Sequence, residues 1–299
     1  MEAAEMTIGI LLSIAAACGY TFNTLFLTLL GRKAGITTTR YIFLIALAAN
    51  LLIHFGVYGR AFPRLESTEV VLYLAVSGVV GYVLGYIAMI SALPLIGPRL
   101  VLLILTSQTV MSFFAGWIIL GETHEPRSYI FVIMVVGGII LAILNKRISV
   151  EKSRHLSGGV LLGFTLAALQ TISQLLSKKA LLAGVPPLSA NTTRLSFAAA
   201  GILVFSLLAG KRIRVQTRDF DAKDWLKIAM ASLIGPVLSV FLSFNALKYV
   251  SLGINSAMLQ LSPLLMLFLA RIVFKEPIRV IAIAGTVLAV SGTTLLILY

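Results

Sequence analysis

The side chains best suited to bind a small polar molecule are amides that lie within long apolar stretches. They are Asn23, Gln108, Gln170, Gln174, Asn245, Asn255 and Gln260. An amide donates and accepts hydrogen bonds, and in apolar surroundings it must find a partner. These residues therefore either bind a polar solute or join neighbouring helices, and the sequence leaves both alternatives open.

Residues for acid–base or metal chemistry are scattered. The carboxylates lie at the ends of the apolar stretches or between them, and the histidines are His54, His124 and His155. With a single cysteine, Cys18, there is no multi-cysteine metal site. We therefore expect no enzyme active site, no metal and no cofactor. His54 alone among the histidines lies within an apolar stretch, where it is either a proton site or an interfacial residue with a satisfied partner.

The composition indicates a membrane protein. Of 299 residues, 59% are hydrophobic and only 12% are charged, with a mean hydropathy of +1.01. A soluble domain usually carries about 25% charged residues. The net charge of +13 is that of a nucleic-acid binder or of a membrane protein with basic loops. In so apolar a chain we favour the second explanation and expect no nucleic-acid partner.

Ten stretches are long and apolar enough to approach the length of a membrane helix. They are Met6–Leu30, Tyr41–Tyr58, Val70–Leu93, Leu100–Leu120, Tyr129–Leu144, Val160–Lys179, Leu195–Ala209, Leu226–Leu247, Leu252–Ala270 and Val280–Leu298. We predict an all-α integral membrane protein with ten transmembrane helices.

The chain carries an internal repeat at an offset of 154 residues. The aligned residues include Thr38–Arg40 with Thr192–Arg194, Gly81 with Gly235, Ala92 with Ala246, Glu122 with Glu276, and Gly138 with Gly292. We predict a first five-helix repeat over residues 1–145, a basic connecting loop over 146–156 and a second repeat over 157–299. Because five is odd, the second repeat must cross the bilayer in the opposite sense, which makes the repeats inverted.

These residues resemble the drug/metabolite transporter superfamily, in its ten-helix EamA-like family. The resemblance rests on Ala92-Leu93, Gly121-Glu122 and Gly138, and on Ala246-Leu247, Ser262-Pro263, Lys275-Glu276, Gly285 and Gly292. Arg40 and Arg194, which open the second and seventh stretches, also fit. The resemblance departs at Thr109, which stands where the second half has Pro263, and at Lys275, which replaces a glycine. The resemblance implies a carrier with a central cavity between its halves, and it names no substrate.

Gln260 is our preferred binding residue, because Ser262-Pro263 interrupts its stretch and frees a carbonyl near Leu259. A broken helix often marks the site of a transporter, although a simple kink explains the same sequence. The other predicted binding residues are Asn23, Gln174, Gln108, Asn245, Tyr20, Tyr86 and Gln170. The predicted gate or structural residues are Pro263, Gly81, Gly235, Glu122 and Glu276.

We expect a secondary transporter that moves a small neutral or zwitterionic metabolite, such as an amino acid, outward by alternating access. The absence of a carboxylate in the middle of a stretch argues against the main alternative, a proton-coupled drug antiporter. A non-transporting scaffold or binding protein stays open as another. We expect a multi-pass protein of the plasma membrane that functions as a monomer in the lipid bilayer, with a small-molecule substrate as its partner.

Overall fold

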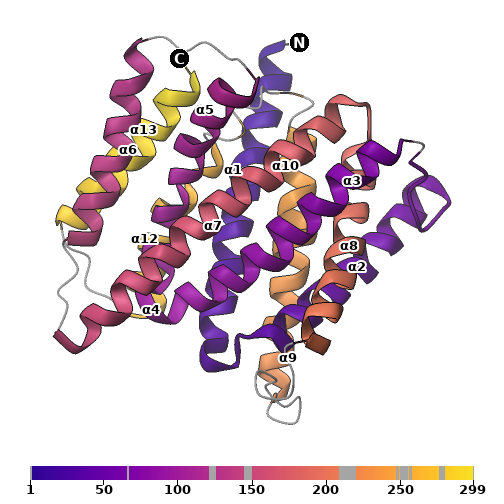
Figure 1. Cartoon of the computed structure of the whole chain (residues 1–299), viewed down its shortest axis with the longest axis horizontal. Coiled ribbons are helices and arrows are strands. Elements are labelled where there is room, and N and C mark those ends of the chain that lie inside the picture. The colour runs from indigo at the N-terminus through magenta and orange to yellow at the C-terminus, as the bar shows by residue number, and fades with distance from the viewer. Residues whose placement is uncertain are drawn as a thin grey trace.

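The protein is a bundle of helices in which the chain returns to the end where it began. The structure is a computed structural model that describes residues 2–65, 67–120, 126–144, 150–208, 220–246, 249, 255, 258–275 and 280–298. Within these ranges every regular element is helical. Helix α1 (Glu2–Leu30) begins and α13 (Val280–Leu298) ends at the same end of the bundle (Figure 1). Such a path requires an even number of crossings.

The elements between these two follow the predicted stretches. They are η1 (Gly31–Lys33), α2 (Ile36–Tyr58), α3 (Thr68–Ser77), η2 (Gly78–Leu84), α4 (Gly85–Leu105), α5 (Ser107–Leu120), α6 (Pro126–Leu144), α7 (Val150–Leu182), α8 (Pro187–Leu208), α9 (Ala222–Ser232), η5 (Leu233–Ser239), α10 (Val240–Ala246) and α12 (Ser262–Val273). Helix α7 begins within the segment predicted as a connecting loop. Within α4, Gly97 has a φ of 77°, and this left-handed residue breaks the helix between the predicted third and fourth stretches.

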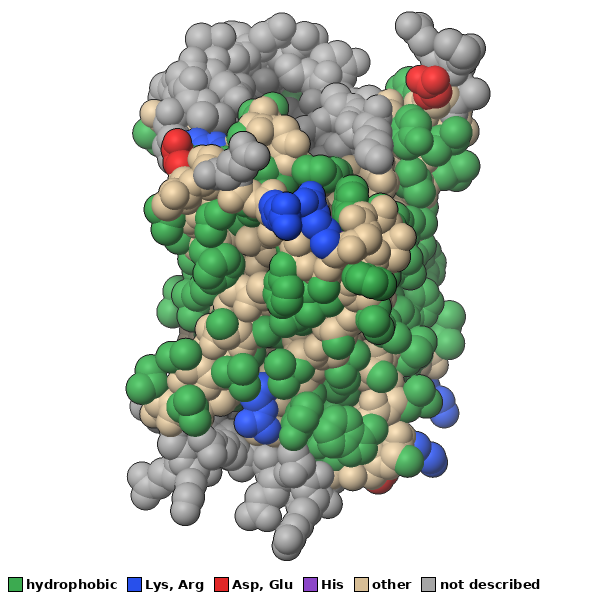
Figure 2. Space-filling model, turned by 90° about the vertical axis from the view of Figure 1, so that its right-hand side faces the viewer, with side chains coloured by type: hydrophobic (Ala, Val, Ile, Leu, Met, Phe, Trp, Pro, Cys, Tyr) green, Lys and Arg blue, Asp and Glu red, His purple; other side chains and the backbone are tan. Residues whose placement is uncertain are grey.

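The surface of the bundle is that of a membrane protein. Six helical stretches in the described residues are long and apolar enough to cross a membrane, and shorter apolar helices cover Tyr129–Leu141, Ser262–Val273 and Ile283–Gly292. Figure 2 shows hydrophobic side chains over most of one face, with Lys and Arg toward its two ends. Large exposed side chains such as Leu52, Ile133 and Leu208 therefore suit contact with lipid.

Three helices begin well before their predicted starts: α2 at Ile36, α7 at Val150 and α8 at Pro187. The seventh stretch was placed at Leu195–Ala209, with Arg194 at its opening. Helix α8 instead begins at Pro187, and Arg194 lies inside it with 6% of its surface exposed. Proline is favoured in the first helical turn, where its missing N–H is not needed. The polar run Asn191–Arg194 therefore belongs to the helix.

The two halves are irregular at matching places. The π-helical segments η2 and η5 coincide to within one residue at the 154-residue offset. The helix also breaks at Thr106, between α4 and α5, and at Gln260–Leu261, before α12, and these breaks are again 154 residues apart. Interruptions of this kind are frequent at functional sites. The repeat is therefore present in the positions of the irregular helical segments as well as in the sequence.

Helices α6 and α13 cross at two glycines that the repeat aligns. A Cβ on Gly138 would lie 2.5 Å from backbone atoms of Gly285 and Ala289, and one on Gly292 would lie 2.8–2.9 Å from backbone atoms of Phe131 and Val135. Later residues of α6 thus meet earlier residues of α13, so the helices are antiparallel. The two contacts interchange under the 154-residue offset. Helices α1 and α7, which open the two halves, also run in opposite directions (Figure 1).

This crossing predicts different outcomes for two adjacent glycines. Gly138→Ala should lower stability by about 1–3 kcal/mol, because the new methyl group overlaps the backbone of α13. Gly137→Ala is the matched control, since its Cβ would meet only Leu288 Cδ2 at 3.9 Å. Thermal unfolding of the detergent-solubilised protein measures both variants. Equal stability of the two would contradict the close backbone contact.

Candidate functional site

A buried group of polar side chains lies where the two halves meet, and we call Asn23, Tyr82, Tyr86, Asn191 and Arg194 the central cluster. Tyr86 Oη donates to Asn23 Oδ1 at 3.2 Å, and Asn23 Nδ2 donates to the Ala231 carbonyl at 2.8 Å. All five side chains are over 90% buried. Two of the predicted binding residues, Asn23 and Tyr86, therefore lie together, and they connect α1 and α4 to α9.

The Ala231 carbonyl, which Asn23 contacts, lacks a helical donor because of a nearby proline. Pro236 lies in η5 and has no N–H, so a carbonyl about one turn earlier loses its helical donor. Asn23 supplies a donor to Ala231, five residues before the proline. Gly235 makes room for this amide, because a Cβ on Gly235 would overlap Asn23. The predicted gate residue Gly235 thus lies directly against a predicted binding residue.

Asn191 of α8 links the second half to the first. Its Oδ1 accepts from Tyr82 Oη at 2.6 Å, and its Nδ2 donates to the Pro236 carbonyl at 2.9 Å and lies 3.4 Å from Asn50 Oδ1 of α2. Phe43 packs on Tyr82 and Tyr86, with ring centroids 5.5 and 4.9 Å away. The cluster therefore combines amides and hydroxyls with aromatic walls.

Arg194 supplies a positive charge to the cluster. Its guanidinium lies 4.6 Å from the centre of the Tyr82 ring, and Nη2 donates to Ser173 Oγ of α7 at 3.0 Å. Its Nε–H is buried without an acceptor. Tyr20 of α1, another predicted binding residue, is partly buried and packs against the apolar core. An ionised group inside a membrane bundle is costly and points to function.

Small residues let the helices around Arg194 approach closely. A Cβ on Gly78 would overlap the Arg194 carbonyl, and one on Gly81 would overlap the Ser173 hydroxyl. Gln170 Nε2 donates to the Gly81 carbonyl at 3.1 Å, within the irregular segment η2. Gln170 and Gly81, both singled out from the sequence, therefore hold α7 against the third span. Helix packing through small residues is common in membranes.

Gln260, the preferred binding residue, lies at a second polar contact between broken helices. Its Nε2 donates to Thr109 Oγ1 at 3.2 Å. The Leu259 carbonyl accepts from Ser262 Oγ at 2.8 Å, and Thr21 Oγ1 lies 3.4 Å from the Ser262 carbonyl. Pro263 is buried in the first turn of α12. The carbonyl predicted to be freed near the proline is thus satisfied by the neighbouring serine.

Three predicted binding residues lie apart from these contacts. Asn245 Nδ2 donates to the Phe241 carbonyl of its own helix at 2.7 Å. The Gln108 side chain is buried, and its backbone carbonyl lies 3.3 Å from Thr171 Oγ1. Gln174 is exposed, although its neighbours Thr171, Ser173 and Ser177 on the same helix are buried.

The predicted proton residue lies toward one end of the bundle, and two of the predicted gate residues lie outside the described residues. His54 is fully buried in the last turns of α2, with Nδ1 2.7 Å from the Arg60 carbonyl and Nε2 3.0 Å from Ser189 Oγ. A carbonyl only accepts, so Nδ1 carries the proton, and Ser189 satisfies the other nitrogen. Glu122 and Glu276 fall in ranges that the structure does not describe.

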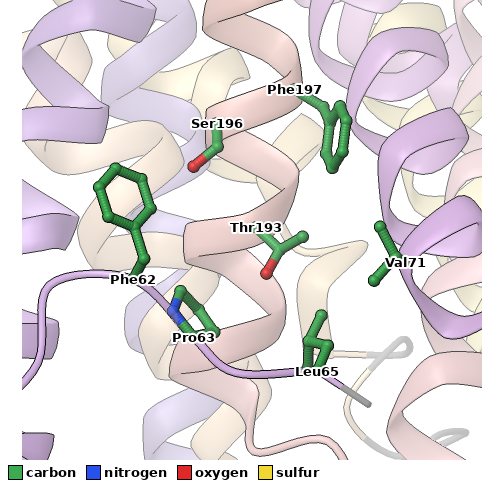
Figure 3. Close-up of a pocket in the computed structure, with 7 residues that line it drawn as sticks. All are labelled: Phe62, Pro63, Leu65, Val71, Thr193, Ser196 and Phe197. Carbon is green, nitrogen blue, oxygen red and sulfur yellow. The ribbon is translucent and has the colours of Figure 1, made fainter. Parts of the chain in front are cut away.

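A small pocket of about 220 Å³ lies between the α2–α3 connection and α8 (Figure 3). Phe62, Pro63 and Leu65 line one side, and Thr193, Ser196 and Phe197 of α8 line another. The two hydroxyls donate to carbonyls of their own helix. The pocket is therefore mostly apolar and offers little to a polar solute.

The charges of the described residues limit the chemistry of the site. Asp224 is the only carboxylate among them that is buried, and it lies in the first turn of α9 rather than in the cluster. No three His, Cys, Asp or Glu side chains gather to bind a metal ion within the part of the chain that the structure describes. The central cluster can offer hydrogen bonds, aromatic surfaces and one positive charge.

Five residues near one another at this site were not predicted from the sequence to lie together: Arg194, Asn191, Asn50, Tyr82 and Ser173. The duplicated Thr-Thr-Arg motif was visible, but it was placed at the opening of the seventh stretch. Gly184 followed by Pro186-Pro187 is a helix-start signal that would have placed the motif inside the helix.

The hydrogen bonds of Asn191 generate a stability prediction. Asn191→Ala should lower stability by about 1–3 kcal/mol, because the Pro236 carbonyl and the Tyr82 hydroxyl both lose a buried partner. Asn245→Ala is the control, since it removes an amide that bonds only its own helix. Thermal unfolding in detergent compares the two. A smaller loss for Asn191→Ala than for Asn245→Ala would contradict the assigned network.

Comparison with known proteins agrees with this architecture. The model of the EamA-like transporter family matches twice, over residues 7–144 and 157–298. A solved structure titled only "Crystal structure of protein" aligns over 95% of this chain and 94% of its own, with 16% identity and a TM-score of 0.68, which shows a shared fold. No curated protein matches. Because both halves match and together make up most of its length, the chain belongs to the EamA-like transporter family and is a membrane transporter of the drug/metabolite transporter type.

Proposed function

We propose that this transporter has ten membrane-spanning helices in two inverted repeats and carries a small neutral or zwitterionic metabolite, such as an amino acid, by alternating access. Export across the plasma membrane by a monomer is the proposed direction and setting. The central cluster carries this proposal, because it places buried amides, hydroxyls and aromatic rings between the two halves. Motion of one half against the other around such a site is how inverted-repeat carriers work.

Different interactions join the helices at the two ends of the bundle, ion pairs at one end and apolar contacts at the other, and this difference supports alternating access. At one end, Asp224 of α9 lies 2.5 Å from Lys33 Nζ and 3.0 Å from Lys227 Nζ, which ties α9 to the end of α1. At the other end, Val70, Leu74, Ala180 and Ala190 form an apolar cluster. Val70 stands 154 residues before Asp224. The repeat thus places charges at one closure and apolar residues at the other.

Counterflow in proteoliposomes tests the proposed function. Proteoliposomes that contain the purified protein are loaded with an unlabelled solute, and the same solute is added outside in labelled form. The solutes are amino acids, nucleosides and one quaternary ammonium ion, each with and without a proton gradient. We expect an amino acid or similar solute to accumulate at a rate that the gradient does not change, because the described residues place no carboxylate in the cluster. Liposomes without protein are the control. Gradient-driven movement of the ammonium ion would favour a proton-coupled antiporter and redirect attention to His54.

The ion pairs at Asp224 predict how the ends are coupled. Asp224→Asn should raise deuterium uptake severalfold in peptides from the end of α1 and from α9, because the closure loses its charge. Uptake around Val70 and Ala190 should fall if the two ends open in turn. Mass spectrometry of hydrogen exchange measures both. Lys223→Gln, an exposed neighbour, is the control. Increased uptake at both ends would indicate local unfolding instead of a gate.

A further inference from the structure

Arg194 is the charged member of the central cluster, and its contacts are incomplete. A guanidinium has five N–H donors in a planar fork. Nη2 donates to Ser173, one face lies over Tyr82, and the buried Nε–H has no acceptor. The structure describes no carboxylate that pairs with it. Removing this cation from water is therefore only partly compensated within the protein.

A purely structural role does not account for these contacts. Beside Arg194, helices are also joined by neutral groups, such as Ser77 Oγ with Ser173 and Ser177, at 2.7–3.0 Å. Neutral residues of similar volume could fill the place of Arg194 without the cost of burying a charge. The unpaired Nε–H of the guanidinium suits an acceptor that comes from outside the chain.

The arginine that the repeat aligns with Arg194 lacks this environment. Arg40 is only partly buried, lies five residues into α2 and contacts the adjacent Tyr41. The positions that correspond to Tyr82 and Ser173 are Pro236 and Gly19. Arg194 lies farther from the start of its helix, because it is the eighth residue of α8 whereas Arg40 is the fifth residue of α2. The duplication thus retains two arginines, and one of them has an aromatic face and a hydroxyl partner in the interior.

We propose that Arg194 binds the carboxylate group of the transported solute, so that among neutral and zwitterionic metabolites the substrates are those that carry a carboxylate, such as amino acids, and exclude cations. Arginine matches a carboxylate with two parallel hydrogen bonds. A single guanidinium balances a single negative charge, which favours a carboxylate over a phosphate dianion. Tyr82, Tyr86 and Phe43 would pack on the apolar part of the solute. That the bound carboxylate belongs to a transported solute rests on the proposed function. The existence of an anion site at Arg194 does not rest on it.

Binding is tested without reference to transport. Thermal unfolding of the purified full-length protein is followed with carboxylates from acetate to 3-phenylpropionate, and with amines from ethylamine to phenethylamine at the same concentrations. Ligands that bind only the folded state raise Tm. We expect the best carboxylate to raise Tm by about 2–4 °C, and the amines to have no effect. If no carboxylate stabilises the protein more than its matched amine, the site does not exist.

Variants assign the effect to one residue. Arg194→Gln should abolish carboxylate stabilisation, and Arg194→Lys should retain part of it because the charge remains without the fork. Arg40→Gln is the matched control and should behave as the unmodified protein. Persistent carboxylate stabilisation in Arg194→Gln would overturn the proposal. If that variant fails to fold, the comparison of Arg194→Lys with Arg40→Gln decides, and equal affinity of these two would overturn the proposal as well.

The two proposals fail separately. Counterflow of a carboxylate, lost about tenfold or more in Arg194→Gln and retained in Arg40→Gln, supports both. Transport of a solute without a carboxylate supports the transporter and removes the role of Arg194 in substrate choice. Selective carboxylate binding without any transport retains the anion site and refutes the proposed function.

Discussion

Each interruption of a membrane helix frees backbone carbonyl oxygens, and the hydrocarbon contains no water to satisfy them. The interior of this bundle is arranged around that constraint. Ala231 and Gly81 receive donors from Asn23 and Gln170, while Leu259 receives one from Ser262. Two amides that were predicted from the sequence to bind a solute therefore also donate hydrogen bonds to carbonyls in or next to η5 and η2. Any motion of these segments must exchange the partners of those amides.

The inverted repeat explains why the irregular segments come in pairs, and its departures explain how the site is made unique. Two π-helical segments and two helix breaks recur at the same offset, as does the glycine crossing of α6 and α13. The side chains placed on this symmetric frame differ. Tyr82 faces Asn191 where the other half has Pro236, and Asp224 stands where the other half has Val70. Under the proposed alternating access, this symmetric backbone would open at either end, while the different side chains would set which solute is held and which end is closed.

Hydropathy and the repeat predicted the helical membrane architecture, the break near Gly97 and the irregularity at Pro263, because each depends on local composition. The contact of Asn23 with Tyr86 was beyond such reasoning, because it depends on the rotation of α1 relative to α4. Arg194 was misplaced because a charged residue at the edge of an apolar stretch normally marks the end of a helix. Its burial depends on Gly78 and Gly81 of another helix. The proposed binding roles of all these residues stay predictions.

As the proposed carboxylate site, Arg194 would connect substrate choice to the conformational cycle. Its guanidinium contacts α7 through Ser173 and the third span through Tyr82, so it touches two elements that close the apolar end. A carboxylate bound there would compensate the buried charge and accept a hydrogen bond from the unpaired Nε–H, at the junction of three helices. An empty carrier would leave that charge uncompensated in its closed form. The same electrostatic cost that makes an unpaired arginine unfavourable in a membrane thereby favours closure around a loaded site over closure around an empty one.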